Sequence, residues 1–335
     1  MRLSTFIKPF THLKLDSFRE LSNQRFGALD DNETDWDYFQ FVVQKFFEGL
    51  YLAVDTNNQE KLLRELDKET IEYRGFVYEG AGMGLIMLDS FLPFKNRFDS
   101  FMRLAGAQYE LLVQIGAGMG FGYLAKGMPV RLVRRDTNKF VDRQDPMQRW
   151  LVVDGYGFFD GMVNWKRVIT EREQPGELVG YGLRAYDQGV GRSLWICTGG
   201  HPGRFQQSIK TFPRGRQADL WGGIGEGLAY AGGVDDFSRV RDLVREAGDF
   251  ADHFAAGVVV GAVGRVRAGE RSAHTDLASN AIWECDSSTL VASADARWTD
   301  GLGSVADADL YEHWRAGLRR EWSADHKHLA DLHSS

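Results

Sequence analysis

The sequence predicts an all-α fold, a tetratricopeptide-like α-solenoid of about six to seven helical hairpins with a C-terminal helical cap. Three observations support it: a glycine motif repeats, its period fits a helical hairpin, and the residues around it stay apolar and free of turn signals. The motif has the form X-Gly-small-Gly-X, and its copies are Glu79–Met83, Ile115–Met119, Asp154–Phe158, Gln188–Arg192 and Gly222–Glu226. The first glycines of successive copies lie 36, 39, 34 and 34 residues apart, which is typical of stacked helix pairs.

The glycines in these motifs indicate close packing of helices. Each glycine costs a helix about 1 kcal/mol relative to alanine, and close approach of a neighbouring backbone is a physical reason to keep it. The alternative is a phosphate-binding loop. A dinucleotide fingerprint, however, occurs once after a strand, and a P-loop needs Gly-Lys-Ser/Thr, which is absent from the chain. We therefore expect packed helices.

The elements around the motifs follow from apolar periodicity. An apolar helix is expected over 36–54, as a degenerate first repeat, and a further glycine-containing unit over 254–266. Amphipathic outer helices are expected over 94–104, 205–212 and 237–247, and a loop or ragged helix over 136–149. We predict one helical-repeat domain over 1–335, divided into an N-terminal arm (1–33), the repeats (34–272) and an irregular C-terminal cap (273–335) with one helix near 310–322.

Composition limits the partners and the compartment. The formal net charge of -7 and the short, interrupted basic stretch 131–135 give no footprint for nucleic acid. Neither a signal h-region nor an apolar run of about 20 residues is present, so we expect a cytoplasmic protein without a membrane span. The cysteines, Cys197 and Cys285, are too few for a disulfide framework.

Alignment of the motifs by their glycines predicts one shared inner wall. The position before the first glycine holds Glu79, Ile115, Asp154, Gln188 and Gly222, and the position four residues later holds Met83, Met119, Phe158, Arg192 and Glu226. A spacing of four puts both positions on one helix face. We therefore expect Arg192 and Glu226 to pair across adjacent repeats.

Buried acids and aromatic residues provide the functional candidates. We predict Glu79, Asp154, Asp160 and Asp187 as catalytic acids, because burial in an aromatic-rich cavity raises a carboxyl pKa and lets the group exchange protons with an apolar substrate. The predicted substrate-binding residues are Tyr78, Tyr156, Arg192, Trp195, Trp221 and Glu226. The alternative for each acid, and for Asp219, is a structural role as a helix cap or as the partner of an arginine.

Two sequence motifs suggest Mg²⁺ as a candidate cofactor. We assign no metal ligands, and the cofactor is unknown. Asp30–Asp35 is similar to the aspartate-rich motif of isoprenoid diphosphate enzymes, and Asp235–Asp242 comes within one position of their second metal motif. Mg²⁺ needs carboxylates that converge from facing elements. Here one group is expected in a loop and the other at a helix start, so capping is favoured over metal binding.

Four motifs resemble a mostly actinobacterial family commonly labelled enediyne biosynthesis protein UnbL. They are Tyr78–Met83, Arg149–Phe158, Asp187–Trp195, and Asp219–Trp221 with Ala229–Asp235, and the likeness spans roughly residues 75–275. The resemblance implies a natural-product gene cluster and a polyketide-derived polyene as substrate, without assigning a reaction. The sequence departs from the family pattern at Phe159–Asp160, where the family tends to have His-Glu, and at Met119, where it tends to have Trp. An isoprenoid is therefore an alternative substrate.

These observations lead to two functional hypotheses. The first is an enzyme that cyclises or rearranges a long hydrophobic polyene or isoprenoid chain, as a terpene cyclase does, with acids for proton transfer, Arg192 and Glu226 as orienting groups, and aromatic side chains that stabilise positive charge. The second is a non-catalytic helical-repeat scaffold or carrier that works with other biosynthetic enzymes. A closed aromatic-lined cavity favours the enzyme, and an open groove favours the scaffold. The oligomeric state is left open.

Overall fold

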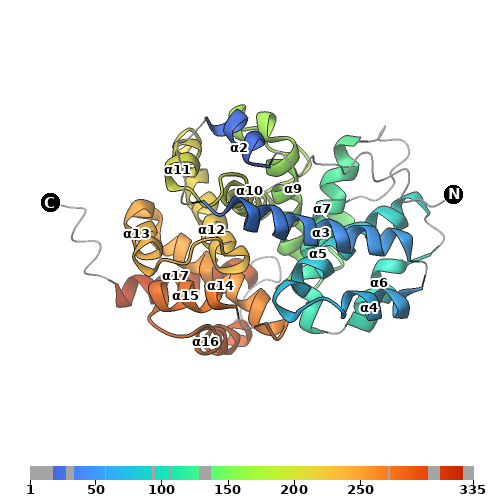
Figure 1. The fold of residues 1–335 in the computed structure, drawn as a ribbon. Helices are drawn as coiled ribbons and strands as arrows, with labels where there is room; N and C mark the ends of the chain where they lie inside the picture. Colours follow the sequence, from blue (N-terminus) through green and yellow to red (C-terminus); the bar gives the residue numbers. More distant parts are fainter. Residues whose placement is uncertain are drawn as a thin grey trace.

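The structure is a computed structural model that describes residues 18–27, 34–56, 58–92, 95–105, 107–127, 137–270, 272–300 and 310–326. These residues form helices and turns, and no strand occurs among them, which confirms the all-α class. Figure 1 shows long helices through the middle of the molecule and shorter helices around them. Within the described ranges, none of the helices combines the length and the apolar character needed to span a bilayer.

Long glycine-containing helices form the centre of the described fold. They are α3 (Trp36–Asp55), α5 (Ile71–Phe91), α7 (Glu110–Gly127), α9 (Arg149–Val163), α10 (Tyr181–Cys197), α12 (Arg214–Ala231) and α14 (Ala251–Arg267). Each helix packs against the next one in this order. The predicted glycine motifs therefore all lie inside helices.

Reciprocal glycine contacts bring the backbones of these helices together. A Cβ atom on Gly116 of α7 would lie 1.8 Å from the carbonyl oxygen of Glu79 in α5, and a Cβ on Gly82 of α5 would lie 2.3 Å from the carbonyl oxygen of Val113 in α7. The same two-way contact joins the other neighbours through Gly49 and Gly80, Gly118 and Gly155, Gly157 and Gly189, Gly191 and Gly223, and Gly225 and Gly257. No side chain fits at these points, which confirms the packing interpretation of the motif.

The other helices, most of them shorter, surround this centre. They are α2 (Phe18–Phe26), α4 (Gln59–Leu66), α6 (Arg97–Ala105), α8 (Thr137–Val141), α11 (Pro202–Lys210), α13 (Phe237–Ala247), α15 (Ala273–Trp283), α16 (Ser287–Asp300) and α17 (Leu310–Asp325), with 3-10 turns η2 (Ala107–Tyr109) and η4 (Gly248–Phe250) and a π-helical turn η3 (Lys166–Thr170). The predicted outer helices correspond to α6, α11 and α13. A buried carboxylate starts α6, because Asp89 accepts the backbone N–H groups of Arg97 and Phe98, each at 3.0 Å.

The two ends of the array meet. Arg265 of α14 donates to the backbone carbonyl of Glu72 in α5 and pairs at 2.6 Å with Glu270, which also accepts the N–H of Gly75 at 2.7 Å. The hydroxyl of Tyr38 in α3 donates to the carbonyl of Ala231 in α12 at 2.6 Å. The long helices thus return to their starting point, and the tetratricopeptide-like solenoid is not confirmed.

The C-terminal region is more regular than the sequence suggested. Residues 273–300, expected to be irregular, form α15 and α16, while the helix expected near 310–322 is α17. The carboxylate of Asp276 fixes the turn between α15 and α16 by accepting the N–H and the hydroxyl of Ser287. These helices are rich in Ser, Thr, Asn and Asp, whose weak helix propensity hid them; packing on α12, α13 and α14 stabilises them.

Candidate functional site

Four charged side chains meet where α5, α9, α10 and α12 converge. Arg192 of α10 contacts Glu79 of α5, Asp154 of α9 and Glu226 of α12, and we call these residues the Arg192 cluster. Arg192 Nη1 donates to Glu79 Oε1 at 3.1 Å, Nη2 lies 2.7 Å from Asp154 Oδ1, and Nε lies 3.5 Å from Glu226 Oε1. All four residues are buried, with at most 3% of their surface exposed. The expected pairing of Arg192 with Glu226 is therefore present in the structure.

Glycine contacts hold the backbone of every member of the cluster. A Cβ added to the facing glycine would lie 1.8 Å from Glu79 O (Gly116), 1.9 Å from Asp154 O (Gly189), 2.5 Å from Arg192 N (Gly223) and 2.6 Å from Glu226 O (Gly261). The repeated motif thus has two effects: it brings the helices together, and it fixes the charged residues beside it. That is why the acids and Arg192 meet, although 147 residues separate Glu79 from Glu226.

Burial dominates the electrostatics of the cluster. Loss of solvent raises the pKa of Glu79 and of Asp154, while Arg192 acts in the opposite direction on both. Burial and the nearby Asp154 carboxylate raise the pKa of Glu226 to about 8. Three carboxyls that share one guanidinium in a site without solvent cannot all be ionised cheaply. Near neutral pH, Glu226 therefore holds a proton.

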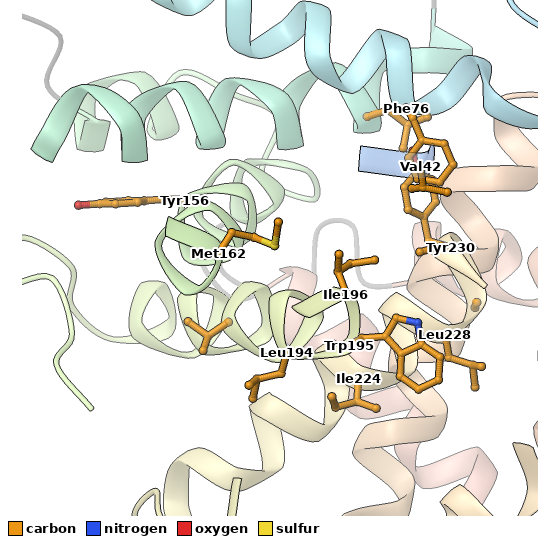
Figure 2. Packing of buried hydrophobic residues seen from close by; sticks show 14 of the residues in the cluster. Val42, Phe76, Tyr156, Met162, Leu194, Trp195, Ile196, Ile224, Leu228 and Tyr230 are labelled. Atoms are coloured by element: carbon orange, nitrogen blue, oxygen red, sulfur yellow. The ribbon is translucent and has the colours of Figure 1, made fainter. Parts of the chain in front are cut away.

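A mostly apolar cavity of about 390 Å³ adjoins the cluster, with Glu79 and Arg192 in its wall. The other lining residues include Val42, Val43, Phe46 and Phe47 of α3, Phe76 and Met83 of α5, Met119 and Tyr123 of α7, Phe158, Phe159 and Met162 of α9, Ile196 of α10 and Tyr230 of α12. In Figure 2, Met162 and Ile196 lie near one another, and Val42, Phe76 and Tyr230 form a second group. Cavities of about 300–1,000 Å³ accept drug-sized ligands.

The cavity has a buried floor and a more exposed rim. Glu79 and Arg192 lie at the floor, where the guanidinium of Arg192 sits 4.4 Å from the ring centroid of Phe158. Tyr123, Phe159 and Asn164 are half-buried, and Val163 is 44% exposed, so the rim lies at the ends of α7 and α9. A ligand that enters here meets aromatic side chains first and the charged residues last.

The aromatic residues that the sequence suggested for substrate binding lie elsewhere. Tyr78 stacks on Tyr109 with centroids 3.7 Å apart and donates to Asp67, and Tyr156 donates to Glu177 at 2.9 Å. In Figure 2 the Tyr156 ring points away from Met162.

The two tryptophans also have structural partners. Trp195 donates from Nε1 to the carbonyl of Gly232 at 2.9 Å, and Trp221 packs edge-on against Phe205 and Phe254. None of these four aromatic side chains is among the cavity-lining residues described above.

Two predicted catalytic acids also lie outside the cavity. Asp160 accepts the Tyr186 hydroxyl at 2.8 Å and the Asn164 amide at 3.0 Å. Asp187 accepts two hydrogen bonds from Arg216, at 2.7 and 2.8 Å, and burial raises its pKa to about 6. Asp219 is likewise held by Arg184 at 3.0 and 3.1 Å. For these acids the contacts correspond to the structural alternative.

Sequence reasoning missed most of the lining. Phe46 and Phe47 come from α3, and Tyr123 and Tyr230 lie beyond the aligned motif positions. A signal for three lining residues was available, however. Met83, Met119 and Phe158 occupy the same motif position as Arg192, and all of them line the cavity.

Residues of both proposed metal motifs cap helices. Asp236 accepts the N–H of Arg239 at 2.8 Å and starts α13, which confirms capping for the second motif. Asp35 caps α3 through Tyr38, whereas Asp30, Asp31 and Glu33 lie outside the described residues. Across the residues that the structure describes, no group of three or more His, Cys, Asp and Glu side chains is arranged to hold a metal ion.

The fold and the site define an all-helical protein with a buried acid–arginine cluster beneath an apolar cavity. The chain belongs to a family described as a protein of unknown function, DUF1702, whose profile matches residues 17–322. That match extends from α2 into α17 and includes every residue of the cluster and of the cavity. Comparison with curated proteins gave no match, and comparison with solved structures gave none either.

Proposed function

We propose that this protein is an enzyme that binds a long hydrophobic polyene or isoprenoid chain in the cavity and cyclises or rearranges it by proton transfer from Glu79. One observation carries the proposal: a buried carboxyl with a raised pKa lies in the wall of an aromatic-lined cavity. The resemblance to the enediyne family supports a natural-product substrate. The cavity supports a ligand that is apolar over most of its length.

The chemistry requires no oxidant and no second substrate. The proton that the three carboxyls share moves to Glu79 and from there to one carbon of a C=C bond, which leaves positive charge on the other carbon. A neighbouring C=C bond attacks that carbon and closes a ring, and loss of a proton to the Glu79 carboxylate gives a neutral isomer. Phe76, Phe158 and Tyr230 stabilise the positive charge through their ring faces. Exclusion of water by the apolar lining prevents capture of the cation.

The charge distribution favours protonation over loss of a diphosphate as the first step. Among the described residues that line the cavity, Arg192 is the single cation, and three carboxylates already contact it. A diphosphate placed beside Glu79 would add negative charge to a buried acidic site, which is unfavourable. Asp154 and Glu226 lie behind Arg192, where they hold the guanidinium and share the proton.

The experiment combines binding with turnover. Purified protein is incubated with linear polyenes and with uncharged polyprenyl chains, and the products are separated and identified by mass spectrometry as isomers of the starting compound. Glu79→Gln should bind the same chain with a similar Kd and lose turnover by at least about 100-fold, as expected for loss of a general acid. Asp89→Asn, which alters another buried acid of α5 that does not line the cavity, is the matched control and should keep turnover.

A carrier of the same ligand is the second candidate, because the cavity alone supports binding. It predicts binding that Val43→Trp abolishes, without an isomeric product from any chain tested. Turnover that survives in Glu79→Gln would contradict the proposed chemistry even if the protein is an enzyme.

A further inference from the structure

A second arginine approaches the Arg192 cluster from the C-terminal helix α17. Arg315 is fully buried, and its Nη2 atom lies 2.8 Å from the position that a Cβ on Gly222 would take. Gly222 precedes Glu226 by four residues, so both face the same side of α12. Glu226 and Tyr311 of α17 also line one narrow space of about 20 Å³. The absence of a side chain at residue 222 is what admits the guanidinium.

Among the residues that the structure describes, Nε, Nη1 and Nη2 of Arg315 make no hydrogen bond of standard geometry, and the neutral hydroxyl of Tyr311 is the polar side-chain group that approaches this guanidinium. A buried guanidinium needs compensating negative charge, because an isolated buried ion is very costly. Its positive charge acts on both Asp154 and Glu226 and opposes the effect of burial on these carboxyls. Glu312 also acts on Arg315, but two other arginines already contact it, so we take the two carboxyls behind Arg192 as the counter-charge of Arg315.

We infer that Arg315 is the second guanidinium of this site, and that the two arginines fix a single proton on the three carboxyls of Glu79, Asp154 and Glu226. With two guanidiniums and three carboxyls, the buried set is electrically neutral when one carboxyl is protonated. Fewer protons would leave net negative charge in the core, and more would leave an arginine without a counter-ion. Arg315 is thus a positioning residue that sets the number of protons, and its use in catalysis rests on the proposed function.

The other titratable groups around the site do not disturb this count. Burial raises the pKa values of Tyr181, Tyr230 and Tyr311, so all three stay neutral. Burial, together with Arg319, Arg315 and Arg184, lowers the pKa of His253 on α14 to about 3, so it is neutral too.

The remaining nearby charges have partners of opposite sign. Glu312 lies 2.9 Å from Arg184 and 2.7 Å from Arg319, and these arginines also contact Asp219 at 3.0 Å and Asp252 at 4.0 Å, respectively. Arg265 pairs with Glu270 at 2.6 Å. The charge balance therefore concerns the Arg192 cluster and Arg315.

The test counts protonated carboxyls in the ligand-free protein by infrared spectroscopy at pH 7, through the C=O stretching band of un-ionised carboxyl groups and its shift in D₂O. Difference spectra against wild type cancel the contribution of unrelated acids. Glu226→Gln should remove one protonated carboxyl, because two carboxylates then balance two arginines. Arg315→Met should add one protonated carboxyl, and Arg315→Lys should leave the count unchanged.

Arg319→Met is the matched control, because Arg319 lies one turn further along α17 and pairs with Glu312 rather than with the cluster. It should give the wild-type count. If Arg315→Met does not fold, adding Asp154→Asn to Glu226→Gln decides the outcome: no further protonated carboxyl should be lost, and loss of a second one overturns the inference. An unchanged band in Glu226→Gln, or a gain in Arg315→Lys, overturns the inference. These spectra need no substrate, so their outcome is separate from that of the turnover experiment.

Discussion

Replacement of Gly116 by alanine tests whether the glycine contacts are what hold the site together. The added Cβ would lie 1.8 Å from the carbonyl oxygen of Glu79, whereas ordinary contact begins at 3.4 Å. Both partners are backbone atoms of long helices, so no side chain can rotate away. Helices α5 and α7 must separate by about 1.6 Å at this point, the shortfall in contact distance, which disturbs the reciprocal contact at Gly82 and moves Glu79 relative to Arg192.

The expected loss of stability follows from two opposing terms. Overpacking costs about 1–3 kcal/mol and occasionally more, and a contact between two backbones belongs at or above the upper end. Alanine in a helix regains about 1 kcal/mol relative to glycine. The net decrease in the free energy of unfolding is therefore about 2–3 kcal/mol. At an unfolding entropy of about 2.1 cal/mol/K per residue, this decrease corresponds to a Tm lowered by about 3–4 °C in a chain of 335 residues.

Urea unfolding and calorimetry measure both quantities. Gly215→Ala is the matched control, because Gly215 also lies in a helix, α12, and an added Cβ there has no atom within 4 Å. This control should stabilise the protein by about 0.4–1 kcal/mol. If Gly116→Ala is as stable as Gly215→Ala, close backbone contact is not the reason for the glycine, and the explanation of the whole motif fails.

Three further outcomes follow from the structure. Arg192→Met should lower the free energy of unfolding by about 3–5 kcal/mol at pH 8 and by less at pH 5, because protonated carboxyls need no cation; urea titrations that give equal losses at both pH values would contradict this. The raised pKa of Glu226 means that the folded state keeps a proton that the unfolded state releases above pH 4.5, so wild-type stability should fall by a few kcal/mol as the pH rises from 4.5 to 8. In Glu226→Gln the free energy of unfolding should depend less steeply on pH over the same range. If its pH dependence equals that of wild type, Glu226 is not the group responsible for the loss of stability. Asp89→Ala should lower the free energy of unfolding by about 0.5–2 kcal/mol through loss of the α6 cap and should leave ligand affinity unchanged. Thermal melts measure the first effect and a binding titration measures the second.

Local patterns predicted the helices and much of the cluster. The apolar run over 36–54 and the amphipathic segment over 237–247 are helices with nearly the expected ends, and the latter matches α13 at both ends. The aligned motif positions placed Arg192 and Glu226 in contact. The spacing of residues along a helix determines the direction of their side chains, so this contact could be predicted from the sequence.

Long-range contacts explain what the sequence could not predict. The closure of the array depends on Arg265 reaching Glu72, and no local pattern links residues so far apart. Trp195 and Tyr156 looked like cavity residues because they lie near or inside a motif copy, but their polar atoms donate to a backbone carbonyl and to a carboxylate elsewhere. Arg315 lies in a segment where the repeat had faded, so only the three-dimensional contact with Gly222 reveals it.

The shared motif position of Met83, Met119 and Phe158 has a consequence for how this family can diversify. These side chains extend into open space from backbone segments that neighbouring glycines lock in place. Exchanges at the three positions can therefore change the length and the bend of the cavity, while Glu79 keeps its place. These positions are the first targets for changing which ligand the cavity fits.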